Sequence, residues 1–315
     1  MSTPLLVRRR ARTGFTLVEL LIAMIIGVII LMLASEIVLS TTRSARSGEA
    51  RASVDRNARF VGLSLQRDLQ EAGVDLESSV DFGSVHAYGD TLVVLRVPYD
   101  STPAMPSREY PSRFTTRPAA GQGTCGTNCL NVDRGASPFE PVVGNVVLLQ
   151  ISNSRRLAIA GTVTTATGTA TIAWPTLTSF LGHTYGLRNP DIRLDAQPMA
   201  NLVRRLEATM YFRSGDSLVR ATRFNATDGR PDGQALATGV SSFRVWLHFT
   251  DGDSAATANG TDLDATNDPN DVTGVSATAV LRPDPNDIRR GYSALPKTFT
   301  WFFAPRNLAY ERNRI

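Results

Sequence analysis

The sequence predicts an α+β protein in which one long N-terminal helix crosses a membrane and then packs on a mainly antiparallel β-sheet domain. Three observations predict it: an apolar run near the N-terminus, a helical apolar pattern that continues it, and period-two alternation in much of the remaining chain. With 315 residues the chain can bury one large core or two small ones. We therefore divide it into a basic leader at 1–14, a helix at 15–73 and a β-rich globular domain at 74–315.

The apolar run predicts a membrane span over residues 15–39. Residues 20–35 carry no charged side chain, and with the apolar residues before them they approach the ~20 residues that cross a bilayer. Glu19 lies inside the span, where a carboxylate is costly unless it is paired. The span contains no Lys, Arg or His, so we expect the partner of Glu19 on another molecule. The alternative is a glutamate that reaches the lipid headgroups and has no role.

The segment before the span is basic and ends in a glycine. Its arginines are Arg8, Arg9, Arg10 and Arg12. Such an excess of positive charge keeps its end of a membrane helix on the cytoplasmic side. A secretory signal is cleaved after its apolar stretch, whereas Gly14 lies before it. Cleavage between Gly14 and Phe15 would remove the leader, leave the helix attached, and create an amino group one helical turn from Glu19.

The stretch "GFTLVELLIAM", residues 14–24, resembles the class III signal of type IV pilins and type II secretion pseudopilins. The resemblance implies that a prepilin peptidase cuts after Gly14 and methylates Phe15. It also implies that Glu19 pairs with the N-terminal ammonium of Phe15 in a neighbouring subunit. The protein would then be a single-pass inner-membrane protein with its C-terminal domain in the periplasm, and would enter a pilus tip or fibre. The implied partners are other minor and major pilins, the prepilin peptidase and the pilus assembly platform, without a cofactor.

The helix is expected to continue beyond the membrane as an amphipathic half at 52–73. Its apolar residues recur at spacings of three and four: Val54, Ala58, Val61, Leu65, Leu69 and Ala72. The interleaved polar residues are Arg56, Arg59, Arg67, Asp68 and Glu71. We expect the apolar stripe to lie on the globular domain and Gly73 to end the helix. Residues 40–51 are small, polar and basic, which suits a membrane surface or a filament groove.

Period-two alternation after Gly73 predicts a sheet. The expected strands are 91–97, 142–151, 157–163, 170–174, 206–213, 217–224, 240–249 and 297–303. In the strand 240–249, Phe243, Val245, Leu247 and Phe249 should face the core. The sequence "RSGDS", residues 213–217, predicts a hairpin turn. Long loops are expected at 99–118, 186–198 and 251–274.

The net charge of the chain without its leader predicts no general affinity for nucleic acid. The formal net charge is +4. The four leader arginines account for it, since without them 29 basic side chains face 29 acidic ones. A DNA-binding pilin is an alternative that rests on local arginines, which would have to gather on one exposed face. Those arginines are Arg155, Arg156, Arg204, Arg205, Arg289, Arg290, Arg306, Arg312 and Arg314.

Few residues suggest catalytic or metal chemistry. Cys125 and Cys129 are the only cysteines, and in a periplasmic domain a disulfide is favoured over free thiols or a metal site. A G-x-G-x-x-G pattern around them, at 121–126, follows no predicted strand and does not indicate dinucleotide binding. His86, His183 and His248 lie far apart and are expected to be structural or surface residues. We find no nucleophile elbow, P-loop or paired Cys and His, and predict no enzyme.

An acidic loop offers a weak calcium candidate. Asp262, Asp264 and Asp268 lie in a loop rich in Asp and Asn, whose oxygens suit calcium. The glycine and terminal glutamate of an EF-hand are missing, and a solvated loop is the favoured interpretation.

Four further segments are similar to the PilW family of large minor pilins: "RNARFVGLSLQRDLQEAGV" (56–74), "LVRRLEATMYFRSGDSLVR" (202–220), "GVSSFRVWL" (239–247) and "FTWFFAPRN" (299–307). The resemblance implies a non-enzymatic minor pilin that primes or caps filament assembly. The J-type minor pseudopilin of type II secretion is the nearest rival, because it would share both the helix and the sheet.

Overall fold

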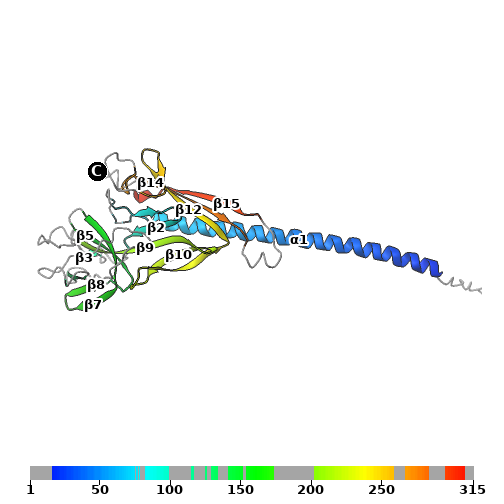
Figure 1. The fold of residues 1–315 in the computed structure, drawn as a ribbon, viewed down its shortest axis with the longest axis horizontal. Helices are drawn as coiled ribbons and strands as arrows, with labels where there is room; N and C mark the ends of the chain where they lie inside the picture. The colour runs from blue at the N-terminus through cyan, green and yellow to red at the C-terminus, as the bar shows by residue number, and fades with distance from the viewer. Residues whose placement is uncertain are drawn as a thin grey trace, which may run out of the picture.

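The structure is a computed structural model, and it shows a long helix whose C-terminal half lies against a β-rich head (Figure 1). It describes residues 16–74, 76, 78, 82–98, 115–116, 125, 129–133, 141–151, 154–173, 202–258, 267–283 and 295–308. The predicted α+β class, with a long apolar helix followed by an antiparallel β-sheet domain, is confirmed. We call the β-rich part together with residues 50–70 of the helix the head.

Helix α1 (Leu17–Gln70) is continuous, so residues 40–51 do not interrupt it. Thr16 caps its N-terminus, and Gly73 follows its C-terminus with a φ of 74°, a conformation that glycine adopts without strain. The first half of α1 projects beyond the head (Figure 1). The predicted apolar stripe of the second half, from Val54 to Ala72, is buried. This confirms the prediction that the stripe faces the globular domain.

The strands are β1 (Val85–Ala87), β2 (Thr91–Arg96), β3 (Thr115–Thr116), β4 (Cys129–Asp133), β5 (Val146–Ile151), β6 (Ser154–Ile159), β7 (Thr162–Ala166), β8 (Thr169–Ala173), β9 (Leu202–Ser214), β10 (Ser217–Phe224), β11 (Pro231–Thr238), β12 (Val240–Phe249), β13 (Ser254–Ala255), β14 (Val272–Leu281) and β15 (Lys297–Phe303). They form an eight-stranded main sheet, a second sheet β13-β12-β14-β15 and a small sheet β4-β8-β7. The main sheet has the order β1-β2-β9-β10-β11, with β3 and β5 also paired to β9 and with β6 paired to β5. All described pairings are antiparallel.

One edge of strand β9 has a different neighbour along each half, and we call the place where the neighbours change the fork of β9. Its second half pairs with β10 across the predicted "RSGDS" turn, where Ser214 is registered with Ser217, and that turn is confirmed. Its first half pairs with β5 instead, up to the pair Val146 and Leu206. The β10 pairing stops at Met210, so residues 207–209 have neither strand beside them on that edge. This fork opens a polar groove, described below.

The core of the head has layers on both faces of the main sheet. One layer joins α1 to alternate residues of β2 and to β12 and β14 of the second sheet, with Leu65 and Tyr211 fully buried. The opposite layer uses the intervening residues, such as Val93 and Met210. The β12 alternation is as predicted, since Phe243 and its partners on that face are buried. Trp301 of β15 packs on α1 at Gly62, where a Cβ would lie 2.5 Å from the indole nitrogen.

Some strand predictions were wrong in part, and several strands were not predicted. The predicted strand 157–163 ends at Ile159, because Ala160 donates to Asn145 and Gly161 donates to Ala173, which moves the chain from one sheet to another. Residues 142–145 form a turn before β5, with Gly144 at a φ of 87°. Strands β1, β3, β4, β11, β13 and β14 were not predicted. In β14 most residues, and in β11 half of the residues, are Ala, Gly, Ser or Thr, whose alternation carries little hydrophobic signal.

Candidate functional site

The first turn of α1 holds Glu19 in a capping box with Thr16. The backbone N–H of Glu19 donates to the Thr16 hydroxyl at 3.3 Å. In return, Glu19 Oε2 accepts from the backbone N–H and from the hydroxyl of Thr16, each at 3.0 Å. The sequence predicted that the partner of Glu19 would lie on another molecule. The structure shows that Thr16 of the same helix supplies neutral donors, and within the described residues Glu19 has no ion pair. Gly14 and Phe15 lie outside the described residues.

Between Leu20 and Ala34 the helix surface that follows Glu19 is apolar on every side. Every large aliphatic side chain between Leu17 and Leu39 is between 49% and 81% exposed, and no strand of the described head lies against it. Helix α1 is long and apolar enough to cross a membrane. A continuous apolar surface of this size needs lipid or other protein around it. The site therefore combines a capped carboxylate with a helix whose partners are other molecules.

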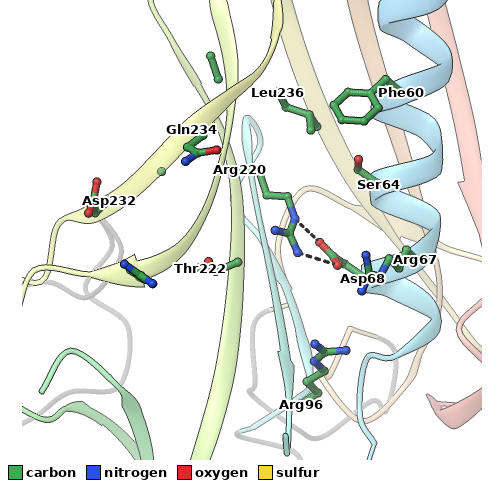
Figure 2. Close-up of a pocket in the computed structure, with 13 residues that line it drawn as sticks. Phe60, Ser64, Arg67, Asp68, Arg96, Arg220, Thr222, Asp232, Gln234 and Leu236 are labelled. Carbon is green, nitrogen blue, oxygen red and sulfur yellow. Dashed lines mark hydrogen bonds and ion pairs between the residues drawn. The ribbon is translucent and has the colours of Figure 1, made fainter. Parts of the chain in front are cut away.

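A second polar site joins the other end of α1 to the main sheet (Figure 2). Asp68 accepts from Arg220 of β10 through two hydrogen bonds, at 2.7 Å from Nε and 2.9 Å from Nη2. Tyr211 of β9 donates its hydroxyl to the same carboxylate. Beside them Arg96 of β2 pairs with Glu71 and with Glu207, the latter at 2.7 Å. The cluster thus ties the helix to three strands.

Burial and charge shape the protonation of this cluster. The side chain of Asp68 is 5% exposed, while that of Arg220 is 33% exposed. Burial raises the pKa of Tyr211 far above its ordinary value, and the negative charge of Asp68 adds to the rise. The hydrogen bonds to Asp68 raise the pKa of the Arg220 guanidinium. Tyr211 therefore stays a neutral donor and Arg220 a cation, which suits a fixed structural clamp better than acid–base chemistry.

The clamp lies in a groove of about 730 Å³ between α1 and the β10–β11 hairpin. Phe60 and Leu236 stand at one end in Figure 2, and Arg96 lies at the other. A second groove of about 740 Å³ continues past Arg220 and Arg223 to the fork of β9. The two grooves share arginine, threonine and aspartate side chains, so the continuous surface is polar.

Sequence reasoning missed this clamp. The sequence placed Asp68 among the polar residues interleaved with the apolar stripe, whereas in the structure its carboxylate is buried against Tyr211 and Arg220. A signal was present: Asp68 follows Val61 and Leu65 at spacings of seven and three, which places it on the apolar stripe. What the sequence could not supply was the pair of strands that brings Tyr211 and Arg220 to that position.

The other predicted site residues lie apart from both sites. Cys125 and Cys129 form a disulfide with a Cα–Cα distance of 5.1 Å. Asp262 and Asp264 lie outside the described residues, as do His183 and residues 121–124 and 126. Asp268 is described and is 4% exposed, so a solvated loop is the wrong interpretation at that position. Within the described ranges, no three His, Cys, Asp or Glu side chains gather as a metal site.

The two described histidines are structural. His86 is buried in β1 next to the Phe82 ring, and His248 contacts Ser276 at 2.8 Å through Nε2.

The arginines proposed for DNA do not gather in the described structure. Arg204 and Arg205 are successive residues of β9, so their side chains leave opposite faces of the sheet. Nothing is described of the Arg155 and Arg156 side chains or of residues 284–294 and 309–315.

Residues 9–35 match the family described as the prokaryotic N-terminal methylation motif. A comparison with curated proteins found no match to the chain. The family match supports a type IV pilin-like or pseudopilin protein that is a structural subunit anchored by its N-terminal helix. Such a signal implies processing by a prepilin peptidase and assembly with the pilin machinery.

Proposed function

We propose that the protein is a minor pilin of a type IV pilus, a non-enzymatic subunit that primes or caps filament assembly. The observation that carries the proposal is the methylation motif joined to an exposed apolar helix with Glu19 in its first turn. The large β-rich head, which resembles the PilW family at four segments, supports the minor-pilin role. In this proposal the membrane holds the helix before assembly, and neighbouring subunits cover it afterwards.

Processing at Gly14 is the first requirement of the proposal. A peptidase that contacts the backbone at Gly14 should reject Gly14→Val, because a branched side chain obstructs the approach that glycine leaves open. Mass spectrometry of the purified wild-type protein should find a chain that begins with methylated Phe15. The Gly14→Val variant should keep its Met1 leader. A wild-type chain that still begins at Met1 in cells with active peptidase would refute the pilin assignment.

Glu19 is proposed to pair with the N-terminal ammonium of Phe15 in a neighbour. Its capping box allows the charge to be tested apart from the cap, because a glutamine at this position can still accept from Thr16. Glu19→Gln should therefore leave the protein at normal abundance in the membrane and lower its co-purification with other pilins, together with surface piliation. Glu36→Ala removes a carboxylate elsewhere on the same exposed helix and serves as the control.

Normal assembly of Glu19→Gln would show that the carboxylate has only a capping role. Normal assembly of Glu19→Ala as well would mean that Glu19 has no role in assembly at all.

A minor pseudopilin of type II secretion is the alternative, because the N-terminal motif serves both systems. Deletion of the gene separates them: loss of piliation with normal protein secretion supports the pilus, and the reverse supports secretion.

A further inference from the structure

The outward face of α1 in the head carries arginines around an exposed apolar pair. We call this surface, formed by Arg56, Arg59, Phe60, Leu63 and Arg67, the arginine face. At 100° per residue its members fall within an arc of about 100°. Phe60 is 55% exposed and Leu63 is 65% exposed, although both lie on a helix that the head otherwise covers. The face therefore has both charge and apolar area available to a partner.

The positive charge of this face is not balanced by acids of the same helix. Between Ala50 and Glu71 the acids of α1 and of its C-cap all pair with strands: Asp55 with Lys297, Asp68 with Arg220, and the C-cap residue Glu71 with Arg96. Arg56, Arg59 and Arg67 form no ion pair within the described part of the chain. Surface arginines commonly find an acid one turn away on the helix. Here each such acid is turned toward the head.

Lipid headgroups are too far away to be the partner. Arg56 lies 17 residues beyond Leu39, the end of the predicted span, which corresponds to ~25 Å along a helix axis. Exposed charges are screened within about 8 Å at physiological ionic strength. Double-stranded nucleic acid is disfavoured by the apolar pair, because its outer phosphates offer Phe60 and Leu63 no complementary surface.

A second copy of this chain is also a poor partner. Two parallel helices that met through this face would bring arginines against arginines, and like charges across an interface are repelled. A favourable partner needs carboxylates opposite Arg56, Arg59 and Arg67 and apolar side chains opposite the pair in the centre. The adjoining groove of about 730 Å³, which Phe60 and Arg67 also line, extends the surface available to such a partner.

We propose that the arginine face binds an acidic amphipathic helix of a different subunit in the same filament. The inference rests on the proposed function, because a filament supplies helices that run beside α1. It adds the chemistry of the neighbour, with carboxylates on the arginines and aliphatic side chains on Phe60 and Leu63. The same charge pattern favours contact with an unlike subunit over stacking of identical copies.

The test uses the full-length chain in its own cells, with a photo-crosslinking amino acid at position 63 or, separately, at position 25. Position 25 lies in the exposed apolar half and reports any neighbour of the helix. The probe at 63 should crosslink to an acidic peptide of another subunit. Reversing Arg56, Arg59 and Arg67 to Glu should lower that yield about tenfold, the effect of losing one strong contact. The yield at 25 should be unchanged.

A matched control reverses Arg213, Arg244 and Arg306 to Glu, since these exposed arginines lie outside α1 and have no acid partner in the described structure. The control should keep the crosslink at 63. Changing the acids of the captured peptide to Lys should restore the crosslink to the reversed variant.

Each other result has a definite meaning. Crosslinking at 63 to a second copy, to nucleic acid or to a peptide without acids overturns the inference, as does a crosslink at 25 alone. If neither position reaches a protein with a methylated N-terminus, the proposed function itself fails.

Discussion

The two halves of α1 belong to one continuous helix but are stabilised by different surroundings. Almost every residue before Ala50 is exposed, whereas the second half buries a stripe that ends at Leu69. Within the described residues, the first half is stabilised by helical hydrogen bonds, by the Thr16 cap and by hydrogen bonds from the hydroxyls of Ser35, Thr41 and Thr42 to carbonyls of the preceding turn. The second half gains a core and a charged clamp. Substitutions in the first half should therefore change assembly, and substitutions in the second half should change folding of the head.

Removing core volume from the second half should have the largest effect on stability. Leu65 is fully buried, so Leu65→Ala should lower the free energy of unfolding by about 2–5 kcal/mol. Leu21→Ala, at a position 53% exposed, should leave the unfolding of the head unchanged. Denaturant titration of the full chain in detergent, followed by tryptophan fluorescence, measures both. Equal losses for the two variants would contradict the division of the helix.

Acid should destabilise the head through His86. Burial lowers the pKa of His86 from 6.5 to about 4, so the imidazole is neutral in the folded head at neutral pH. The stability that the neutral His86 side chain contributes is fully present above pH 6.5 and is lost as the pH falls from 6.5 to 4. The reason is that His86 takes up its proton at a higher pH in the unfolded chain than in the folded head. The expected loss is about 3 kcal/mol.

Denaturant titrations between pH 7 and pH 4 test this expectation. His86→Phe should remove most of the slope in that range, and Leu65→Ala should keep it. An unchanged slope in His86→Phe would assign the acid sensitivity to other groups.

The charged clamp should show a smaller loss. Asp68→Asn leaves Arg220 and Tyr211 facing a neutral amide, and hydrogen bonds to a charged group contribute about 1.5–3 kcal/mol. Because Arg220 is partly exposed, water can replace some of its lost contact. Tyr211→Phe should cost less and should couple to Asp68→Asn in a double-mutant cycle. Glu19→Gln, the matching change in the first half, should not alter the unfolding of the head.

Alanine substitutions of one glycine in each half of α1 compare the two halves directly. A Cβ at Gly62 would lie 2.5 Å from the indole nitrogen of Trp301, whereas nothing lies within 4 Å of a Cβ at Gly27. Gly62→Ala should therefore cost about 1–3 kcal/mol in the unfolding of the head. Gly27→Ala should instead strengthen the local helix by about 1 kcal/mol. Circular dichroism and the fluorescence of Trp301, measured with the other two tryptophans replaced by Phe, separate the two effects. An unperturbed fluorescence spectrum in Gly62→Ala would show that the contact is loose.

The smallest effect is expected at the surface pair of Lys297 and Asp55, whose nitrogen and oxygen lie 2.7 Å apart. Both side chains are about half exposed, and exposed pairs contribute about 0–1 kcal/mol. A double-mutant cycle of Lys297→Ala and Asp55→Ala at low and high salt measures the coupling. A coupling well above 1 kcal/mol would show that β15 is held to the helix by this pair more than by Trp301.

The sequence by itself determined the features that depend on local pattern. The apolar span, its single early carboxylate and the glycine before it predicted the membrane helix, because spacing and composition alone decide whether a segment can cross a bilayer. The apolar stripe from Val54 to Leu69 and the alternation in β12 likewise predicted which faces are buried, since side-chain direction follows from the helical and strand periods.

The tertiary structure decided what depends on residues far apart in the chain. It placed Asp68 inside because Arg220 lies 152 positions later on a neighbouring strand and neutralises it. It made β14 a strand between β12 and β15, although its small residues show little alternation. It also turned Asp55, Asp68 and Glu71 toward the strands, which left Arg56, Arg59 and Arg67 alone on the outer face. Contacts between residues far apart in the sequence decided each of these positions, and no short stretch of sequence contains both partners of such a contact.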